Sequence, residues 1–440
     1  MKIAIILGTR PEIIKMASVI DEIIKKDMEL LLIHTGQHYD PEMSDAFFKD
    51  LKLPYPDYNI AVGSFSHGKQ TAKMMEGIEE VLVKEHPDIV LVQGDTNAVL
   101  AGALVASKLH VPVGHVEAGL RSYDDSMPEE VNRKIADACS MFYFVPTEKS
   151  AINLSLEGID RNKIHIAGNT IVDACYRNLK IAKNPNRQLE FDKKLLNLEN
   201  IVTLTMHRAE NVDNKQRLIS IIGAISKLTE ANIIFPIHPR TKKTLEDFGL
   251  LDKLSKLDHI HLIKPLGYLD FLLLLSKSSL VLTDSGGLQE EAITLNVPAI
   301  TLRYNTERPE TVDVGANILV GADENKIIEF SKKVLNDCEF SNSMKNIKNP
   351  YGNGNSGFKI IEIIHNSYLN GNLKITSPED IMSIFNTKIS KINEDINVSD
   401  FEDKNNFRIR IVYNGSNIEF PEDNLNLKNK LVVFDVFKNN

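Results

Sequence analysis

The sequence predicts an α/β protein with two Rossmann-like domains, each built on a parallel β-sheet. Short runs that are almost wholly apolar alternate with amphipathic helical patterns, as expected for strands covered on both faces by helices. The same alternation occurs in both halves of the chain. In addition, 440 residues are too many for one hydrophobic core and favour two or three domains.

Five apolar runs in the first half are predicted to be strands. Helical patterns separate them, and those at residues 11–25 and 98–108 are the clearest. We expect these elements to form a first domain of residues 1–183. The predicted strands are residues 3–7, 30–33, 89–92, 111–115 and 141–145.

The second half repeats this plan after a polar segment, Lys183-Asn184-Pro185-Asn186, that is expected to link the domains. The second domain is predicted to cover residues 184–370, closed by a last helix at about 357–369. Two doubly wound domains leave a cleft at the carboxyl ends of their strands, where such folds bind ligands. The predicted strands are residues 201–205, 233–236, 260–263, 280–283 and 299–302.

Residues 371–440 differ in composition and are rich in asparagine. The stretch Thr376-Ser377-Pro378-Glu379 is typical of a helix start, and residues 407–413 and 431–437 resemble strands. This extension of unknown role could pack on the main body, form a contact surface for another subunit or partner, or be disordered.

The composition is that of an ordinary globular protein, with 42% hydrophobic and 25% charged residues. The formal net charge of −9 argues against a nucleic-acid-binding protein, which would usually be basic. Neither a signal peptide nor an apolar stretch long enough to span a membrane is found. The three cysteines are far apart, which argues against a disulfide framework. We therefore expect a cytoplasmic protein.

Two strand-to-helix turns carry features that suit an anion. The first is Gly8-Thr9-Arg10-Pro11-Glu12, followed by a helix bearing Lys15. The second is Asp284-Ser285-Gly286-Gly287, followed by a helix that carries Glu290 and Glu291. Glycines let backbone amides approach a phosphate, and the helix start favours negative charge. A nucleoside diphosphate is the natural ligand, with Glu291 within reach of its ribose; close packing at a glycine turn is the alternative.

Carboxylates and histidines cluster where the predicted strands end. Asp95 and Glu117 each follow an apolar strand, while Glu129 and Glu130 open a helix after Pro128. Carboxylates facing a cleft can serve as acid and base, although a glutamate at a helix start is often only a dipole partner. His207, Arg208 and His238 follow the first two strands of the second domain, where they could neutralise a diphosphate.

A further motif is rejected. Gly352-Asn353-Gly354-Asn355-Ser356-Gly357 matches the dinucleotide fingerprint, but no strand precedes it, so it is not predicted to bind a nicotinamide cofactor. No spacing of His, Cys, Asp or Glu suggests a metal site. We expect neither a cofactor nor a metal.

In these motifs the sequence resembles the non-hydrolysing UDP-N-acetylglucosamine 2-epimerases of the microbial type. The resemblance covers roughly residues 1–369. Its carriers, in this order, are Gly8–Glu12, Gln93-Gly94-Asp95-Thr96, His115–Arg121, Pro128–Arg133, Gly168-Asn169-Thr170, Thr283–Glu291 and Thr306–Glu310.

The resemblance implies a glycosyltransferase-B architecture and interconversion of UDP-N-acetylglucosamine and UDP-N-acetylmannosamine by a homodimer, with no nucleic acid or membrane as partner. It also implies three groups of site residues. They are catalytic Asp95, Glu117, Glu129 and His207; UDP-sugar-binding Arg10, Lys15, Phe271, Ser285, Gly286, Gly287, Glu291 and Arg308; and, at a second, activating site, Gln37, Gln70, Glu130, Arg208 and His238.

The chain departs from the family pattern in two places. Tyr304 stands where members usually have aspartate, and residues beyond 371 have no counterpart.

The favoured mechanism is loss of the sugar carbon 2 proton and of UDP to give 2-acetamidoglucal, followed by re-addition. The alternatives are an epimerase of another UDP-acetamido sugar, a glycosyltransferase of the same fold and a non-catalytic UDP-sugar sensor.

Overall fold

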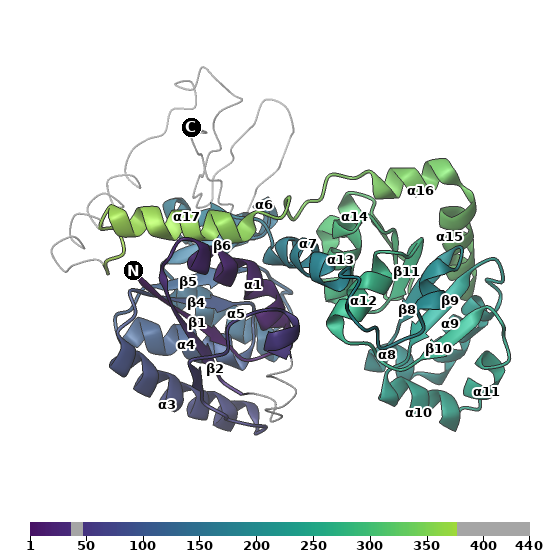
Figure 1. Ribbon diagram of the computed structural model, residues 1–440, viewed down its shortest axis with the longest axis horizontal. Helices are drawn as coiled ribbons and strands as arrows, with labels where there is room; N and C mark the ends of the chain where they lie inside the picture. Colours follow the sequence, from purple (N-terminus) through teal and green to yellow (C-terminus); the bar gives the residue numbers. More distant parts are fainter. Residues whose placement is uncertain (37–46, 376–440) are drawn as a thin grey trace, which may run out of the picture.

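The computed structural model describes residues 1–36 and 47–375. Two parallel β-sheets, each covered by helices on both faces, lie side by side (Figure 1). Gln37 and most of the C-terminal extension, with its predicted helix start and two strands, lie outside the described residues. In the part of the chain that is described, no helix is long and apolar enough to cross a membrane.

The first sheet has seven strands in the order β3-β2-β1-β4-β5-β6-β7. The strands are β1 (Lys2–Leu7), β2 (Glu29–His34), β3 (Tyr58–Asn59), β4 (Ile89–Gln93), β5 (Val113–Val116), β6 (Phe142–Val145) and β7 (Ile164–Ile166). The helices of this part of the chain are α1 (Arg10–Lys25), α3 (His67–Glu85), α4 (Asn97–Lys108), α5 (Pro128–Cys139), α6 (Glu148–Leu156) and α7 (Thr170–Ala182).

Strand β1 illustrates why the strands are apolar throughout. Ile3, Ile5 and Leu7 belong to the hydrophobic core beneath α1 and α7. The alternate side chains Ala4 and Ile6 belong to the core beneath α3 and α4. Successive side chains of a strand point to opposite faces, so a strand covered on both faces needs apolar residues at every position.

The second sheet has six strands in the order β10-β9-β8-β11-β12-β13. They are β8 (Ile201–Thr205), β9 (Asn232–Pro236), β10 (Ile260–Ile263), β11 (Leu280–Thr283), β12 (Ala299–Thr301) and β13 (Asn317–Leu319). The main helices are α8 (Ala209–Val212), α9 (Lys215–Ser226), α10 (Pro239–Asp247), α11 (Leu251–Leu254), α12 (Tyr268–Leu275), α13 (Gly286–Thr294), α14 (Pro309–Asp313), α15 (Glu324–Asn336) and α16 (Cys338–Lys345).

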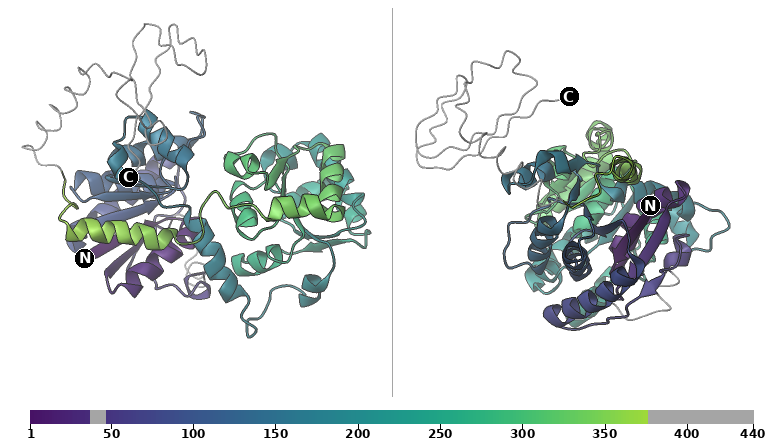
Figure 2. Two further views of the ribbon diagram at one scale, coloured as in Figure 1. Left: turned by 90° about the horizontal axis from the view of Figure 1, so that it is seen from above. Right: turned by 90° about the vertical axis from the view of Figure 1, so that its left-hand side faces the viewer.

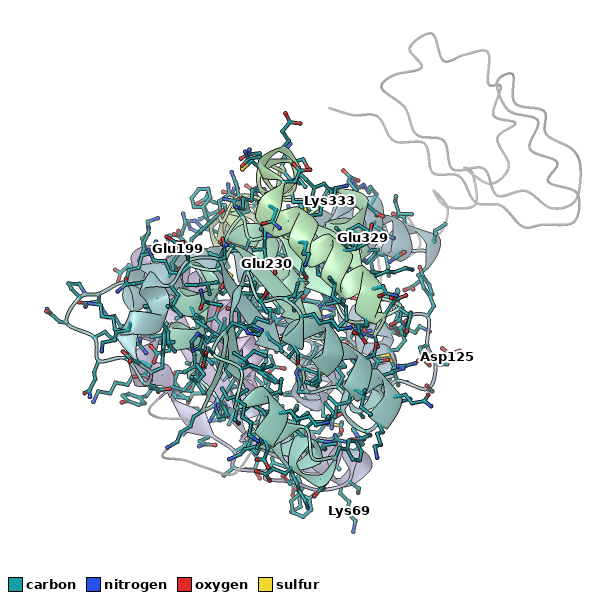
Figure 3. The ribbon with its side chains drawn as sticks, turned by 90° about the vertical axis from the view of Figure 1, so that its right-hand side faces the viewer. Lys69, Asp125, Glu199, Glu230, Glu329 and Lys333 are labelled. Atoms are coloured by element: carbon teal, nitrogen blue, oxygen red, sulfur yellow. The ribbon has the colours of Figure 1, made fainter. Side chains whose placement is uncertain are left out.

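All ten predicted strands are confirmed to within two residues at either end. The sequence analysis missed β3, β7 and β13, which have two or three residues each and are too short to show a period. The surface of the second domain is strongly charged, with Glu199, Glu230 and Glu329 among its acidic side chains and Lys333 beside them (Figure 3).

The expectation that the last helix closes the second domain is wrong. Helix α17 (Ser356–Leu369) crosses back and packs on α1 and α7 of the first domain (Figures 1 and 2). Its apolar residues Ile360, Ile361 and Ile364 are fully buried there. Gly357 makes the close approach possible, because a Cβ at this position would lie 2.7 Å from the backbone of Ser18. The Gly357 amide also donates to Asp173 Oδ1 of α7 at 3.0 Å.

Candidate active site

Each sheet reverses its strand order once, and the predicted site residues follow the strands at these two points. In the first sheet β1 and β4 are neighbours, and they lead into the Gly8 turn and Asp95. In the second sheet β8 and β11 are neighbours, and they lead into His207 and Ser285. Such reversal points are where open α/β sheets bind ligands.

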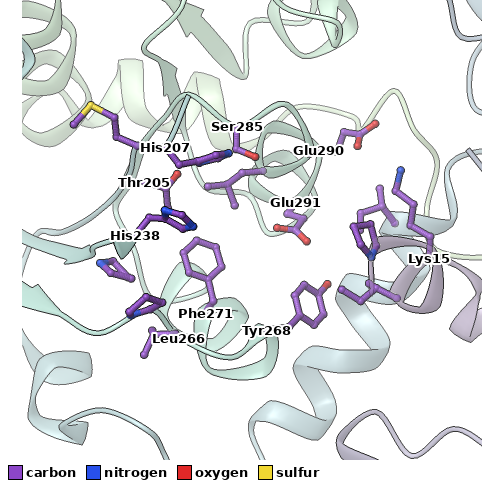
Figure 4. A pocket seen from close by; sticks show the side chains of 18 residues that line it. Lys15, Thr205, His207, His238, Leu266, Tyr268, Phe271, Ser285, Glu290 and Glu291 are labelled. Carbon is purple, nitrogen blue, oxygen red and sulfur yellow. The ribbon is translucent and has the colours of Figure 1, made fainter. Parts of the chain in front are cut away.

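A cavity of about 370 Å³ opens between the two domains. The first domain contributes Lys15 and α1, and the second contributes the ends of β8 and β9 and the starts of α12 and α13 (Figure 4). The sequence-predicted residues that line it are Lys15, His207, His238, Phe271, Ser285, Gly287 and Glu291. Its size and its few polar groups suit a small-molecule ligand.

The start of α13 forms an anion cradle. Ser285 is the N-cap residue, and Gly286 and Gly287 are the first two helical residues, whose amides have no partner within the helix. A Cβ at Gly287 would meet no atom within 4 Å, so this side of the helix start faces open space. The amides and the helix dipole together favour a phosphate here.

This geometry predicts opposite effects for the substitution Gly287→Ala. Alanine favours a helix over glycine by about 1 kcal/mol, so thermal stability should stay equal or rise. The added methyl group occupies the space that a phosphate needs, so UDP affinity should fall about tenfold, which is ~1.4 kcal/mol. Gly68→Ala is the matched control, because Gly68 is the second residue of α3 and its Cβ would also be free. Calorimetric titration with UDP and a melting curve for each variant test the prediction, and unchanged UDP affinity in Gly287→Ala would contradict it.

Glu117 is held at the end of β5 by cations and amides. Lys15 Nζ lies 2.7 Å from both carboxylate oxygens, and Arg308 Nη2 lies 3.9 Å from Oε1. The side-chain amide of Gln93 also donates to this carboxylate. Although burial disfavours the charged form, the two cations lower the pKa of Glu117 below its usual value. The ion pair with Lys15, which lines the cavity, therefore favours the charged form of Glu117.

The backbone at Glu117 is strained. Its φ of +70° lies in the left-handed region, which non-glycine residues other than Asn and Asp seldom occupy. Such a conformation costs on the order of 1–3 kcal/mol and is typical of functional sites.

A buried ion network lies behind β5. His115 Nδ1 is 2.6 Å from Asp137 Oδ1, and His115 Nε2 is 2.8 Å from the Gly94 carbonyl oxygen. Asp137 also accepts from Arg121 at 2.7 Å. Since both partners of the His115 ring are hydrogen-bond acceptors, both ring nitrogens donate. Burial disfavours the charged imidazolium, but the neighbouring Asp137 carboxylate raises the pKa of His115. This network fixes the turn that presents Asp95.

Asp95 and Glu130 share one cation. Arg133 Nη2 lies 2.5 Å from Asp95 Oδ2, and Arg133 Nη1 lies 2.8 Å from Glu130 Oε2. Glu130 is buried and also accepts from the amide and hydroxyl of Ser122 at 2.9 and 3.0 Å. Asp95 is partly exposed, and Glu129, in the first turn of α5, is half-buried.

Buried Asp284 positions the cationic pair at the end of β8. Its carboxylate accepts from the backbone amides of His207 at 3.1 Å and Arg208 at 3.0 Å. Nearly half of the His207 side chain is exposed, and its ring lies 6.5 Å from the ring of His238. His238 is the N-cap of α10. The two histidines lie side by side at one end of the cavity (Figure 4).

Glu291 lies one turn into α13, on the cavity wall opposite His207, with Tyr268 and Phe271 below it (Figure 4). Burial raises the pKa of Glu291 to about 7. A carboxyl group here can accept hydrogen bonds from ribose hydroxyls, and the Phe271 ring offers an apolar surface for a base.

The remaining predicted residues lie around this centre. Arg10 is exposed at the start of α1, with its guanidinium 5.7 Å from the Phe47 ring. Gln70 is buried and donates to the Gly63 carbonyl at 3.0 Å while it accepts from Asn97 at 2.8 Å. Tyr304, the departure noted in the sequence, lies over Gly321 and beneath the Arg217 guanidinium, at 5.2 Å.

The sequence analysis missed Glu290 and Asn169 as site residues. Glu290 is buried, lines the cavity and lies with its Oε1 2.7 Å from Arg308 Nε. The side-chain amide of Asn169 donates to the Glu290 carboxylate at 2.9 Å and to the Glu117 carboxylate at 3.4 Å. The helical spacing could have predicted Glu290. It lies four residues after Gly286 and three after Gly287, and therefore on the same face of α13 as these two glycines. In the described ranges no group of three or more His, Cys, Asp or Glu residues could hold a metal ion.

Known proteins match most of the described chain. The family model described as UDP-N-acetylglucosamine 2-epimerase matches residues 22–365. A UDP-N-acetylglucosamine 2-epimerase of Methanocaldococcus jannaschii is 54% identical over 368 residues, covering 83% of this chain and 99% of the relative. A crystal structure of the M. jannaschii UDP-GlcNAc 2-epimerase in complex with UDP-GlcNAc and UDP matches with a TM-score of 0.71 at 54% identity, with the same coverage. A UDP-2,3-diacetamido-2,3-dideoxy-D-glucuronate 2-epimerase of Pseudomonas aeruginosa is 41% identical, over 83% of this chain and 99% of its own.

Proposed function

Since the chain belongs to the UDP-N-acetylglucosamine 2-epimerase family, we propose that it interconverts UDP-N-acetylglucosamine and UDP-N-acetylmannosamine. The observation that carries the proposal is the meeting of two features at one interdomain cavity. Lys15, which lines the cavity, holds the ionised carboxylate Glu117, and the anion cradle of α13 opens on the same cavity. A base and a diphosphate site are thus within one substrate's reach.

The chemistry requires both features. Carbon 2 of the sugar is not adjacent to a carbonyl, so its proton is difficult to remove directly. Elimination resolves this: the C2–H electron pair becomes the C1–C2 double bond, the C1–O bond breaks, and its electron pair leaves with UDP. The products are 2-acetamidoglucal and UDP, both still bound. Protonation of carbon 2 from the other face and return of UDP to carbon 1 complete the inversion.

We assign proton transfer, diphosphate binding and uridine binding to side chains described above. Glu117, whose carboxylate is paired with Lys15, is the candidate to accept the carbon 2 proton once that pairing is relaxed. Asp95 and Glu129 are the candidates for proton transfer on the other face. The cradle at Ser285–Gly287, with His207, Lys15 and Arg308, would stabilise the leaving diphosphate. The Phe271 and Glu291 side of the cavity would hold the uridine.

The residues predicted for a second, activating nucleotide site are placed together only in part. His238 lines the cavity beside His207, and Arg208 lies 3.9 Å from Glu307, whereas Gln70 and Glu130 use their hydrogen bonds within the first domain. We propose that Arg208 and His238 serve the edge of the main site. We also propose that the chain works in the cytoplasm as a homodimer. Its three free cysteines are compatible with a reducing compartment.

The direct test is proton NMR of the purified protein with UDP-N-acetylglucosamine in deuterated buffer. We expect the manno product with UDP still attached and with deuterium at carbon 2. Epimerisation without deuterium would contradict solvent-exchanging acid and base groups. The second substrate to test is UDP-2,3-diacetamido-2,3-dideoxyglucuronate, because a relative that is 41% identical is named as a 2-epimerase of that sugar nucleotide. Turnover of that compound alone would replace the proposed substrate, and steady release of free UDP would point to a hydrolase or a transferase.

A further inference from the structure

Glu290 and Glu117 form one ionic cluster that joins the two domains. Lys15, Glu117 and Asn169 come from the first domain, whereas Glu290 and Arg308 come from the second. Arg308 lies between the carboxylates, 2.7 Å from Glu290 and 3.9 Å from Glu117. Asn169 donates to both. The two carboxylates therefore compete for the same donors.

Among the described residues, the side chain of Glu290 forms hydrogen bonds and ion pairs only with members of this cluster. Its Oε2 is buried and accepts no hydrogen bond, and its side chain is on the wall of the cavity. A buried carboxylate oxygen without a donor is costly, so a role in function accounts for it better than a role in stability. The helix that carries Glu290 also carries the anion cradle, one turn earlier.

We propose that Glu290 is a positioning residue that holds Arg308 and Asn169 in place and yields them when the diphosphate binds. The inference rests on the proposed function for the identity of the diphosphate. A diphosphate at the cradle attracts the same cations, Lys15 and Arg308, that now neutralise Glu290 and Glu117. Its binding draws them from the carboxylates, and the carboxylates become free to exchange protons with the substrate.

This transfer of cations from the carboxylates to the diphosphate should change the number of protons that the protein binds, and that number can be measured. The charged groups around the pair are Lys15 from α1, Arg133 from α5, Glu291 from α13 and Arg308 before α14, with the Tyr351 hydroxyl before α17. Burial raises the pKa of Glu290, and Arg308 and Lys15 oppose this rise. A carboxylate that loses a cationic partner gains proton affinity, so its pKa rises. UDP binding at mildly acidic pH should therefore take up protons from the buffer.

The test compares UDP binding to the full-length wild type and to Glu290→Gln by calorimetry in two buffers of different ionisation enthalpy. We expect proton uptake by the wild type, and less uptake by the variant. We also expect the variant to bind UDP at least as tightly, because one competitor for Arg308 is gone. Its kcat should fall at least about tenfold, because Arg308 and Asn169 lose their partner. Asp173→Asn removes another buried carboxylate, which lies in α7 and accepts from the Gly357 amide, and should leave the proton uptake unchanged.

Two results would overturn the proposal. One is the absence of proton uptake by the wild type, a result that does not depend on how the variant folds. The other is UDP binding that weakens in Glu290→Gln in step with kcat, as expected for a residue that only supports the fold. Failure of the wild type to epimerise UDP-N-acetylglucosamine would instead count against the proposed function, since UDP binding is measured without turnover.

Discussion

Replacing Glu117 with glutamine is expected to slow epimerisation by about 10²–10⁴-fold, the usual contribution of a general base. Glutamine keeps the size of the side chain but cannot accept the carbon 2 proton. The amide also gives up the charge that now binds Lys15 through both oxygens. UDP affinity should not fall, because Lys15 becomes available to the diphosphate.

The measurement is the rate of manno product formation and of deuterium exchange at carbon 2. Loss of both activities with retained UDP binding is the expected result. Gln93→Leu is a useful companion, because it removes one donor to Glu117 without removing the carboxylate and should cost far less activity. Near-normal turnover by Glu117→Gln would assign the base to another group, of which Asp95 is the first candidate.

Replacing Arg308 with methionine is expected to destabilise the protein by about 3–5 kcal/mol at neutral pH, the cost of leaving a buried charge without its partner. Arg308 lies between two carboxylates that are almost fully buried, with side-chain exposures of 4% for Glu117 and 1% for Glu290. Methionine fills the space but neutralises neither of them.

The size of this loss should depend on pH in a defined direction. Arg308 lowers the pKa of both carboxyl groups, so both values rise in the variant. A carboxyl group whose folded pKa is raised costs stability at high pH, and the cost disappears as the pH falls and the group is protonated. The gap between wild type and variant should therefore narrow from neutral towards acidic pH.

Urea denaturation at neutral and at acidic pH tests this expectation. The matched control is Arg303→Met. Arg303 is also largely buried, with 5% of its side chain exposed against 15% for Arg308, but its partners Glu210 and Glu307 are 38% and 24% exposed. Water can solvate these partners, so the control should lose less stability and depend less on pH. An equal loss in both variants at every pH would mean that only packing is affected.

The sequence by itself determined the architecture and the place of the site. The apolar runs and their spacing predicted ten strands, because a strand buried on both faces is marked locally, residue by residue. The residues just after these strands, such as Asp95 and Glu117 in the first sheet and Ser285 in the second, were predicted to face the cleft between the domains, because the parallel strands of a sheet end at one edge. Neither inference needs knowledge of how distant segments pack.

Only the tertiary structure decided which groups pair with which. The apolar face of α17 predicted burial, but its spacing does not say that α1 of the first domain covers it. Likewise, Glu290 is an ordinary helix residue in sequence, and only the fold brings it to Asn169, 121 positions away. The charge of Glu117 likewise depends on Lys15 and Arg308, which are distant in sequence and reach Glu117 only in the folded chain. Periodicity is a local property of the chain, whereas burial partners and proton affinities depend on contacts between segments that only folding brings together.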